Sequence, residues 1–363
     1  MSPDLELSAD QLAKRAQDAV EDLKREGLKA GVVEEWEDCY RTAAQPDAFE
    51  WWYFDAQFDN GWTAVLVYST KPMTKPHAAL KPSVQIILHD PEGNRRRLSP
   101  TFKGADLVAS AETCDVRIGP NLLRGNLDHY VLHAEADDGT VVDLKFDRGA
   151  PSWRPGAGFS YFDAKKAKYM AWVVPIPYGT VEGTLTVDGK SVPVKGTGYH
   201  DHNWGNVSPG LGIDHWYWGR AHVGDFSLIF VQIVTAKAPV VGSLKLPVFF
   251  MARGDEIIIE DGLPLSLVTD KVVDGPHGRT YPTELTFNWS SDDGTVELAI
   301  TNPKLIETID VIEDMRRWQQ ALIHLFANPT YYDFNADLEL TVDYKGIKAT
   351  EKGRALYEIM MLR

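Results

Sequence analysis

The stretch Gly196-Thr197-Gly198-Tyr199-His200-Asp201-His202-Asn203-Trp204-Gly205 gathers more proton-handling groups than any other decapeptide of this chain. A phenol, a carboxylate, two imidazoles, an amide and an indole stand between glycines. The stretch lies near the middle of the chain, just before a segment that repeats an earlier one. We therefore expect it to close a first β-barrel and to lead into a second.

The second half of the chain repeats the first half in the same order. The matched segments are Trp52-Tyr53-Phe54 with Trp216-Tyr217-Trp218, Asp138-Gly139-Thr140-Val141 with Asp293-Gly294-Thr295-Val296, and Gly198 with Gly353. A repeat that keeps its order indicates a duplicated module of about 150 residues. Copy two continues with Arg354-Ala355-Leu356 where copy one has the polar cluster. Because the second copy lacks it, the cluster is not needed to build the module.

Short, evenly spaced strands are expected from residue 48 onward. In the first half they cover residues 49–55, 62–70, 84–89, 116–118, 130–136, 141–146, 181–187 and 192–195. The dipeptides Asp138-Gly139 and Asp188-Gly189 are typical hairpin turns. This spacing favours an all-β fold built from antiparallel barrels or sandwiches.

Two helices are expected beside the strands. The first covers residues 8–27, where Ser8 and Gln11 form a capping box and Gly27 is a plausible end. The second covers residues 312–326 in copy two, from the spacing of its apolar residues. The chain then divides into an N-terminal helix (1–30), a first β-barrel domain (31–198) and a second one (199–363).

Composition and charge exclude several classes of function. With 363 residues, 44% of them hydrophobic, the chain is long enough for two domains with sizeable cores. Its formal net charge of −15 disfavours nucleic acid or an anionic membrane as partner. Two cysteines cannot form a thiolate zinc site, and no apolar run is long enough for a transmembrane segment. The N-terminus has no pattern typical of a secretory signal, so we expect a cytoplasmic protein.

The candidate chemistry centres on Asp201. On a strand, Tyr199, Asp201 and Asn203 face one way, and His200, His202 and Trp204 face the other. A carboxyl group in an apolar, aromatic pocket has a raised pKa and can act as a general acid near neutral pH. The alternative interpretation is a polar strand end whose side chains bond turn backbone.

A metal site is the competing interpretation of the same stretch. His200 and His202 have the H-x-H spacing of zinc ligands, and His215 and His222 follow downstream. The sequence does not fix a third ligand, so we expect neither a metal nor another cofactor. His202 is then expected to orient a carboxylate or to donate to a bound oxygen, although on a regular strand it reaches Asp201 only through a bulge or the next turn.

Other candidate residues are acidic or aromatic. Glu50 precedes an aromatic strand, and it is either structural or a second carboxylate of the site. Tryptophans are more often core than site, but their faces suit a hydrophobic polyene and can stabilise a carbocation. The tryptophans kept as substrate-binding candidates are Trp51, Trp52, Trp172, Trp204, Trp216 and Trp218.

Two motifs carry a resemblance to a known group. Glu50-Trp51-Trp52-Tyr53-Phe54-Asp55, together with residues 198–205, resembles the lipocalin-like superfamily of carotenoid 1,2-hydratases (hydroxyneurosporene synthases), AttH-type proteins and fungal decalin-forming Diels–Alderases. The resemblance implies two tandem lipocalin-like antiparallel β-barrel domains that bind a hydrophobic ligand without an organic cofactor. The Tyr-x-Asp pair of the hydratases falls on Tyr199 and Asp201. Their upstream His-x-Trp pair has Trp172 as its nearest counterpart, without the histidine.

These observations lead to a functional expectation. We expect an enzyme that protonates an alkene of a polyene or terpenoid, with hydration or cyclisation to follow. Asp201 would be the proton donor, Tyr199 and His202 would position it, and Asn203 would bond substrate or water. A pericyclase that acts through pocket shape, and a non-catalytic carrier of lipids or isoprenoids, remain as alternatives. The sequence indicates no particular oligomeric state.

Overall fold

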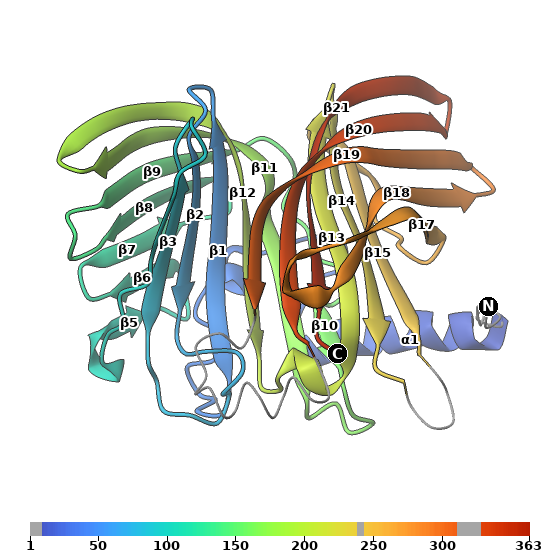
Figure 1. The fold of residues 1–363 in the computed structure, drawn as a ribbon. Coiled ribbons are helices and arrows are strands. Elements are labelled where there is room, and N and C mark those ends of the chain that lie inside the picture. The colour runs from blue at the N-terminus through green and yellow to red at the C-terminus, as the bar shows by residue number, and fades with distance from the viewer. Residues whose placement is uncertain (1–8, 238–242, 311–327) are drawn as a thin grey trace. The chain divides into compact units, whose positions relative to one another are not determined.

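The computed structural model describes residues 9–237, 243–310 and 328–363 of the chain (Figure 1). The chain forms two compact units: unit 1 ends at Pro209 and unit 2 begins at Gly210. The boundary expected after residue 198 lies inside strand β12 (Lys190–Gly205). Residues up to Gly205 pair with β1 of unit 1, so the polar cluster completes the first sheet.

Unit 1 is built on one antiparallel 12-stranded sheet. Its strands are β1 (Phe49–Phe58), β2 (Thr63–Ser69), β3 (Ser83–His89), β4 (Arg95–Leu98), β5 (Leu107–Ala109), β6 (Cys114–Ile118), β7 (Asn121–Gly125), β8 (His129–Glu135), β9 (Val141–Arg148), β10 (Phe159–Tyr161), β11 (Tyr169–Val187) and β12. The order across the sheet is β4-β3-β2-β1-β12-β11-β9-β8-β7-β6-β5, with β10 beside β11.

The first sheet curls around its own core. Ile86 of β3 and Val116 of β6 belong to one buried apolar cluster, although their strands lie far apart in the sheet order. They can meet only if the sheet folds back on itself, as Figure 1 shows. The alternation of buried and more exposed residues along β2 and β9 is typical of a sheet with one face on a core.

Unit 2 is built on one 9-stranded antiparallel sheet. Its strands are β13 (Ile213–Val223), β14 (Phe226–Thr235), β15 (Lys245–Arg253), β16 (Glu256–Ile259), β17 (Leu265–Asp274), β18 (Thr280–Ser291), β19 (Gly294–Asp310), β20 (Thr330–Tyr344) and β21 (Ile347–Met361). The order is β16-β15-β14-β13-β21-β20-β19-β18-β17. This is the order of unit 1 with β13 in the place of β1 and β21 in the place of β12, which confirms the all-β tandem lipocalin-like fold.

The sequence match of Trp52-Tyr53-Phe54 with Trp216-Tyr217-Trp218 is wrong by one residue, because the two first strands, β1 and β13, do not place these residues on the same face. Trp52 and Phe54 face the core of unit 1. In β13 it is Tyr217 that packs against the core of unit 2, while Trp216 turns to the other face and donates to Glu358. Side chains alternate along a strand, so a shift of one residue exchanges the two faces.

Helical segments are few in the described parts of the chain. Helix α1 (Ala9–Glu26) confirms the first expected helix, and its Val20 is exposed. The second expected helix, 312–326, lies outside the described residues. Four short 3-10 turns are η1 (Glu35–Asp38), η2 (Gly104–Asp106), η3 (Pro209–Leu211) and η4 (Pro276–Gly278). No helix in these parts is long and apolar enough to cross a membrane.

Candidate functional site

The pairing of β12 with β1 decides where the polar cluster points. The two strands pair in continuous register from Phe49 opposite Gly205 to Phe58 opposite Gly196. Side chains therefore alternate along β12 as expected. Tyr199, Asp201 and Asn203 share the face opposite the core, and their neighbours at positions 200, 202 and 204 point inward. Within this ladder no bulge brings His202 round to Asp201.

Asp201 is the centre of a hydrogen-bonded group on the face opposite the core. Its Oδ2 accepts the Tyr199 hydroxyl at 2.9 Å and the Trp172 indole N–H at 3.1 Å. Its Oδ1 accepts the Asn203 amide at 2.8 Å. Trp172 comes from β11, where it pairs with Asn203. Tyr199 is fully buried, whereas Asp201, Asn203 and Trp172 are partly exposed.

The surroundings of Asp201 favour its protonated form. Burial raises the pKa of Asp201 to about 7, against the bonds from Tyr199, Trp172 and Asn203, which lower it. The buried carboxylate of Asp55 raises it further, from a position opposite Tyr199 on β1. A carboxyl group that keeps its proton near neutral pH is the chemical requirement for a general acid.

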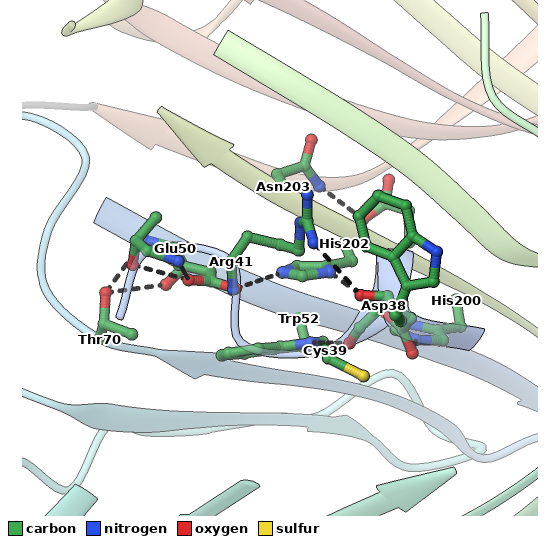
Figure 2. A network of polar contacts seen from close by, with 12 residues as sticks. Asp38, Cys39, Arg41, Glu50, Trp52, Thr70, His200, His202 and Asn203 are labelled. Carbon is green, nitrogen blue, oxygen red and sulfur yellow. Dashed lines mark hydrogen bonds and ion pairs between the residues drawn. The ribbon is translucent and has the colours of Figure 1, made fainter. Parts of the chain in front are cut away.

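A second polar cluster lies on the core face of the same strands (Figure 2). Asp38 of η1 is fully buried, and its carboxylate accepts the Tyr130 hydroxyl at 2.6 Å and His200 Nε2 at 3.2 Å. Its other oxygen lies 3.3 Å from Nδ1 of His202. His200 Nδ1 also contacts the backbone oxygen of Tyr53 at 2.9 Å. Both ring nitrogens of His200 thus lie against oxygen atoms, one of the backbone and one of Asp38.

Glu50 holds the segment after η1 onto the sheet. Its carboxylate accepts the backbone N–H groups of Arg41 and Thr42, the Thr42 hydroxyl, and His202 Nε2 at 2.8 Å. Glu50 is fully buried. A carboxylate has about four acceptor sites, and these four contacts occupy them. This geometry fits the structural interpretation of Glu50 and leaves its carboxylate no acceptor site for a substrate.

The charged groups of this second polar cluster, called the inner cluster below, stabilise one another. Burial alone would raise the pKa of Asp38, but His200 and His202 hold it well below its usual range. Burial alone would lower the pKa of His202, but Asp38 and Glu50 raise it above its ordinary value. Each charge compensates the desolvation of its partners. Among the described residues, no group of three or more His, Cys, Asp or Glu is arranged to hold a metal ion.

The predicted tryptophans fall into three places. Trp52 is in the core, stacked on His202 with ring centroids 4.6 Å apart, and Trp204 packs on the other side of that imidazole at 4.9 Å. Trp172 contacts Asp201, and Trp51 lies opposite Asn203 on the same face. Trp216 and Trp218 belong to β13 of unit 2.

The predicted role of His202 needs correction. His202 cannot position Asp201, because it points into the core and both its ring nitrogens face carboxylates. Asn203 bonds Asp201 itself. Sequence reasoning also missed Asp38, Tyr130 and Arg41. Asp38 and Arg41 precede the first strand, in a segment without periodicity, and no pattern there indicates contact with a strand far along the chain.

Comparisons with known proteins agree with this fold. The sequence profile of the Svf1 family matches residues 100–362. The chain is 28% identical over 224 residues to hydroxyneurosporene dehydrogenase of Chlorobaculum tepidum, covering 52% of this chain and 57% of that protein. It is 25% identical over 198 residues to the ceramide-binding protein svf1 of Emericella nidulans, covering 51% and 50%. It is 34% identical to the quinolone epoxide rearrangement protein penF of Penicillium thymicola over 67 residues, 18% of each chain. These matches span at most a little over half of each relative.

Solved structures match over more of the chain. An AttH protein from Nitrosomonas europaea has a TM-score of 0.63 at 16% identity, covering 92% of this chain and 98% of that one. Kievitone hydratase from Nectria haematococca has a TM-score of 0.56 at 17% identity, covering 91% and 93%. Together these comparisons confirm the resemblance read from the two motifs. The chain belongs to the Svf1 family.

Proposed function

We propose that this member of the Svf1 family is an enzyme that protonates an alkene of a hydrophobic polyene or terpenoid, with Asp201 as the acid. The observation that carries the proposal is the carboxyl group of Asp201. It is held by Tyr199 and Trp172 and has a pKa of about 7. It can therefore be protonated near neutral pH and still leave a stabilised carboxylate after the proton departs.

The hydrogen-bond donors around Asp201 favour one of its two carboxyl oxygens as the carrier of the proton. Oδ2 accepts two bonds and Oδ1 accepts one, so Oδ1 has the lone pair available to carry the proton. Transfer to one alkene carbon leaves a cation on the other, and the face of Trp172 can stabilise that charge. In hydration, water adds to the cation and its surplus proton returns to Asp201. In cyclisation, a second double bond adds to the cation, and a neighbouring C–H proton returns to Asp201.

The relatives support chemistry on small organic molecules in this fold. Their names include a hydratase, a quinolone epoxide rearrangement protein and a hydroxyneurosporene dehydrogenase. A second candidate is a non-catalytic lipid carrier, because one relative is a ceramide-binding protein. In that case the group around Asp201 would be a polar anchor for the ligand.

Turnover in deuterium oxide separates these candidates. The full chain would be incubated with a panel of acyclic polyenes and terpenoids, and the products examined by mass spectrometry. Deuterium on a product carbon that was an alkene carbon supports protonation. Product without label contradicts the proposal and supports a pericyclic route. Tight binding without any product also contradicts the proposal, and it supports a carrier.

A further inference from the structure

The side chain of Arg41 is partly buried and has few polar contacts for a cation. It follows η1, and its Nη1 donates only a long bond of 3.5 Å to the Trp36 carbonyl. Its Nε is buried and has no hydrogen-bond partner. The guanidinium carbon lies 4.3 Å from the ring centroid of Trp36 and 5.7 Å from that of Trp204. Most of the five N–H donors of this guanidinium are therefore available.

Arg41 lines a small hollow at one end of the first sheet. Its other polar lining residues are Glu37 and Arg154, and its aromatic ones are Phe159, Trp172 and Trp204. The hollow has room for about one water-sized group, which is the size of a single carboxylate oxygen. Trp172 belongs both to this hollow and to the group that holds Asp201.

Among the described residues, Arg41 has no ion pair at contact distance, although Glu50 and Glu37 act on its charge from further away. Arg154 Nε lies 3.3 Å from Glu37 Oε2, so these two charges match each other. Glu50 is occupied by His202 and by backbone N–H groups. Burial lowers the pKa of Arg41 by more than Glu50 and Glu37 raise it, which is the cost of a partly desolvated cation. An anion in the hollow would offset this cost and satisfy the unpartnered Nε.

We propose that this hollow binds a carboxylate at one end of the hydrophobic ligand, with Arg41 as its cationic partner. Arg pairs with carboxylates through parallel N–H donors, and the bonds are short and strong because both partners are charged. The hydrocarbon would then extend from the hollow along Trp172 toward Asp201. The substrate class narrows to polyene or terpenoid acids. This inference rests on the proposed function for the identity of the hydrocarbon.

Retinoic acid and retinol test the proposal, because they share one polyene and differ in the head group. Binding to the full chain is measured by quenching of tryptophan fluorescence. Retinoic acid is expected to bind about tenfold more tightly than retinol. Arg41→Gln is expected to remove that difference, and Arg41→Lys to restore part of it. Arg148→Gln, a change at a half-exposed arginine of β9 paired with Asp128, should leave it intact.

Several outcomes would overturn the assignment. They are equal affinity for the two retinoids, a preference that survives in Arg41→Gln, and no binding of either compound. The wild-type comparison remains decisive if Arg41→Gln does not fold. Asp201→Asn keeps the preference for retinoic acid if the inference holds, whatever becomes of turnover. A failure of the proton-transfer proposal is therefore distinguishable from a failure of this one.

Discussion

The hydroxyl of Tyr199 donates a 2.9 Å hydrogen bond to Oδ2 of Asp201, two residues further along the same face of β12. The bond favours the carboxylate, whereas burial favours the neutral acid. The balance places the pKa of Asp201 at about 7, so a small change in either contribution changes the fraction of acid present at neutral pH.

Asp201→Asn should abolish most of the activity. The amide preserves the size of the side chain but cannot donate a proton to an alkene. Loss of a general acid lowers the rate by about 10²–10⁴-fold. The measurement is kcat on whichever polyene is turned over, with Asp147→Asn as the matched control at an exposed site of β9. Near-normal turnover by Asp201→Asn would contradict the role of proton donor.

The rate should fall with rising pH, and Tyr199→Phe should move the fall upward. If Asp201 is the proton donor, its acid form is the active one, so kcat is expected to be level below about pH 7 and to decline above it. Tyr199→Phe removes a hydrogen bond that lowers the pKa of Asp201, so the decline should begin at higher pH. A pH–rate profile of both proteins checks this. A decline that stays in place would show that Asp201 is not the titrating group.

Asp38→Asn should destabilise unit 1 by about 3–5 kcal/mol, because it leaves two buried imidazoles without their shared carboxylate. Urea unfolding measures the loss. Asp115→Asn, which removes a more exposed ion pair with Arg124, should cost about 1 kcal/mol or less. Equal midpoints for the two variants would argue against a structural role for the inner cluster.

The contribution of this cluster should also depend on pH. The folded pKa of Asp38 is lowered, so its contribution is present above its unfolded value of about 3.9 and is lost as pH falls through the folded value. The folded pKa of His202 is raised, so its contribution is lost as pH rises above about 6.5 and through the folded value. The gap between wild type and Asp38→Asn should therefore be widest between these limits. A constant gap from pH 3 to pH 9 would contradict the charge pairing.

Gly198→Ala should destabilise the protein where Gly210→Ala does not. A Cβ at Gly198 would lie 2.5 Å from the Asp55 carbonyl oxygen and 2.5 Å from the Phe146 ring, and neither neighbour can move freely. A Cβ at Gly210 would meet nothing within 4 Å. Overpacking of this kind costs about 1–3 kcal/mol. Thermal unfolding of the two variants side by side measures the difference, and equal melting temperatures would rule out the close contact.

Much of the fold followed from local pattern. Turn dipeptides such as Asp138-Gly139 and Asp188-Gly189 located hairpins, and the ordered repeat predicted a duplicated β module, which the structure shows as two antiparallel sheets. The alternation along β12 correctly separated Asp201 from His202. The domain boundary was harder to predict, because the strand that closes the first sheet continues for several residues past Gly198.

The inner cluster could not be predicted, because its members are distant in sequence. Asp38 meets His200 and Tyr130 only after the sheet has curled and η1 has docked onto it. Arg41 and its hollow depend on the same docking. Tertiary packing decides such contacts, and no propensity or spacing in a single sequence records them.

The hairpin between β11 and β12 also influences which side chains of β12 face the hydrocarbon core and which face away from it. Its turn at Asp188 and Gly189 begins a ladder that, after two register shifts, places Trp172 opposite Asn203 and Val173 opposite His202. A change in turn length that moved the pairing register of β12 by one residue would exchange the two faces of this strand. Asp201 would then enter the hydrocarbon core, and the imidazoles of His200 and His202 would take its place outside. The length of this turn would therefore help to decide whether a carboxyl group or an imidazole faces each side of the sheet, although the turn lies at the opposite end of β12 from Asp201.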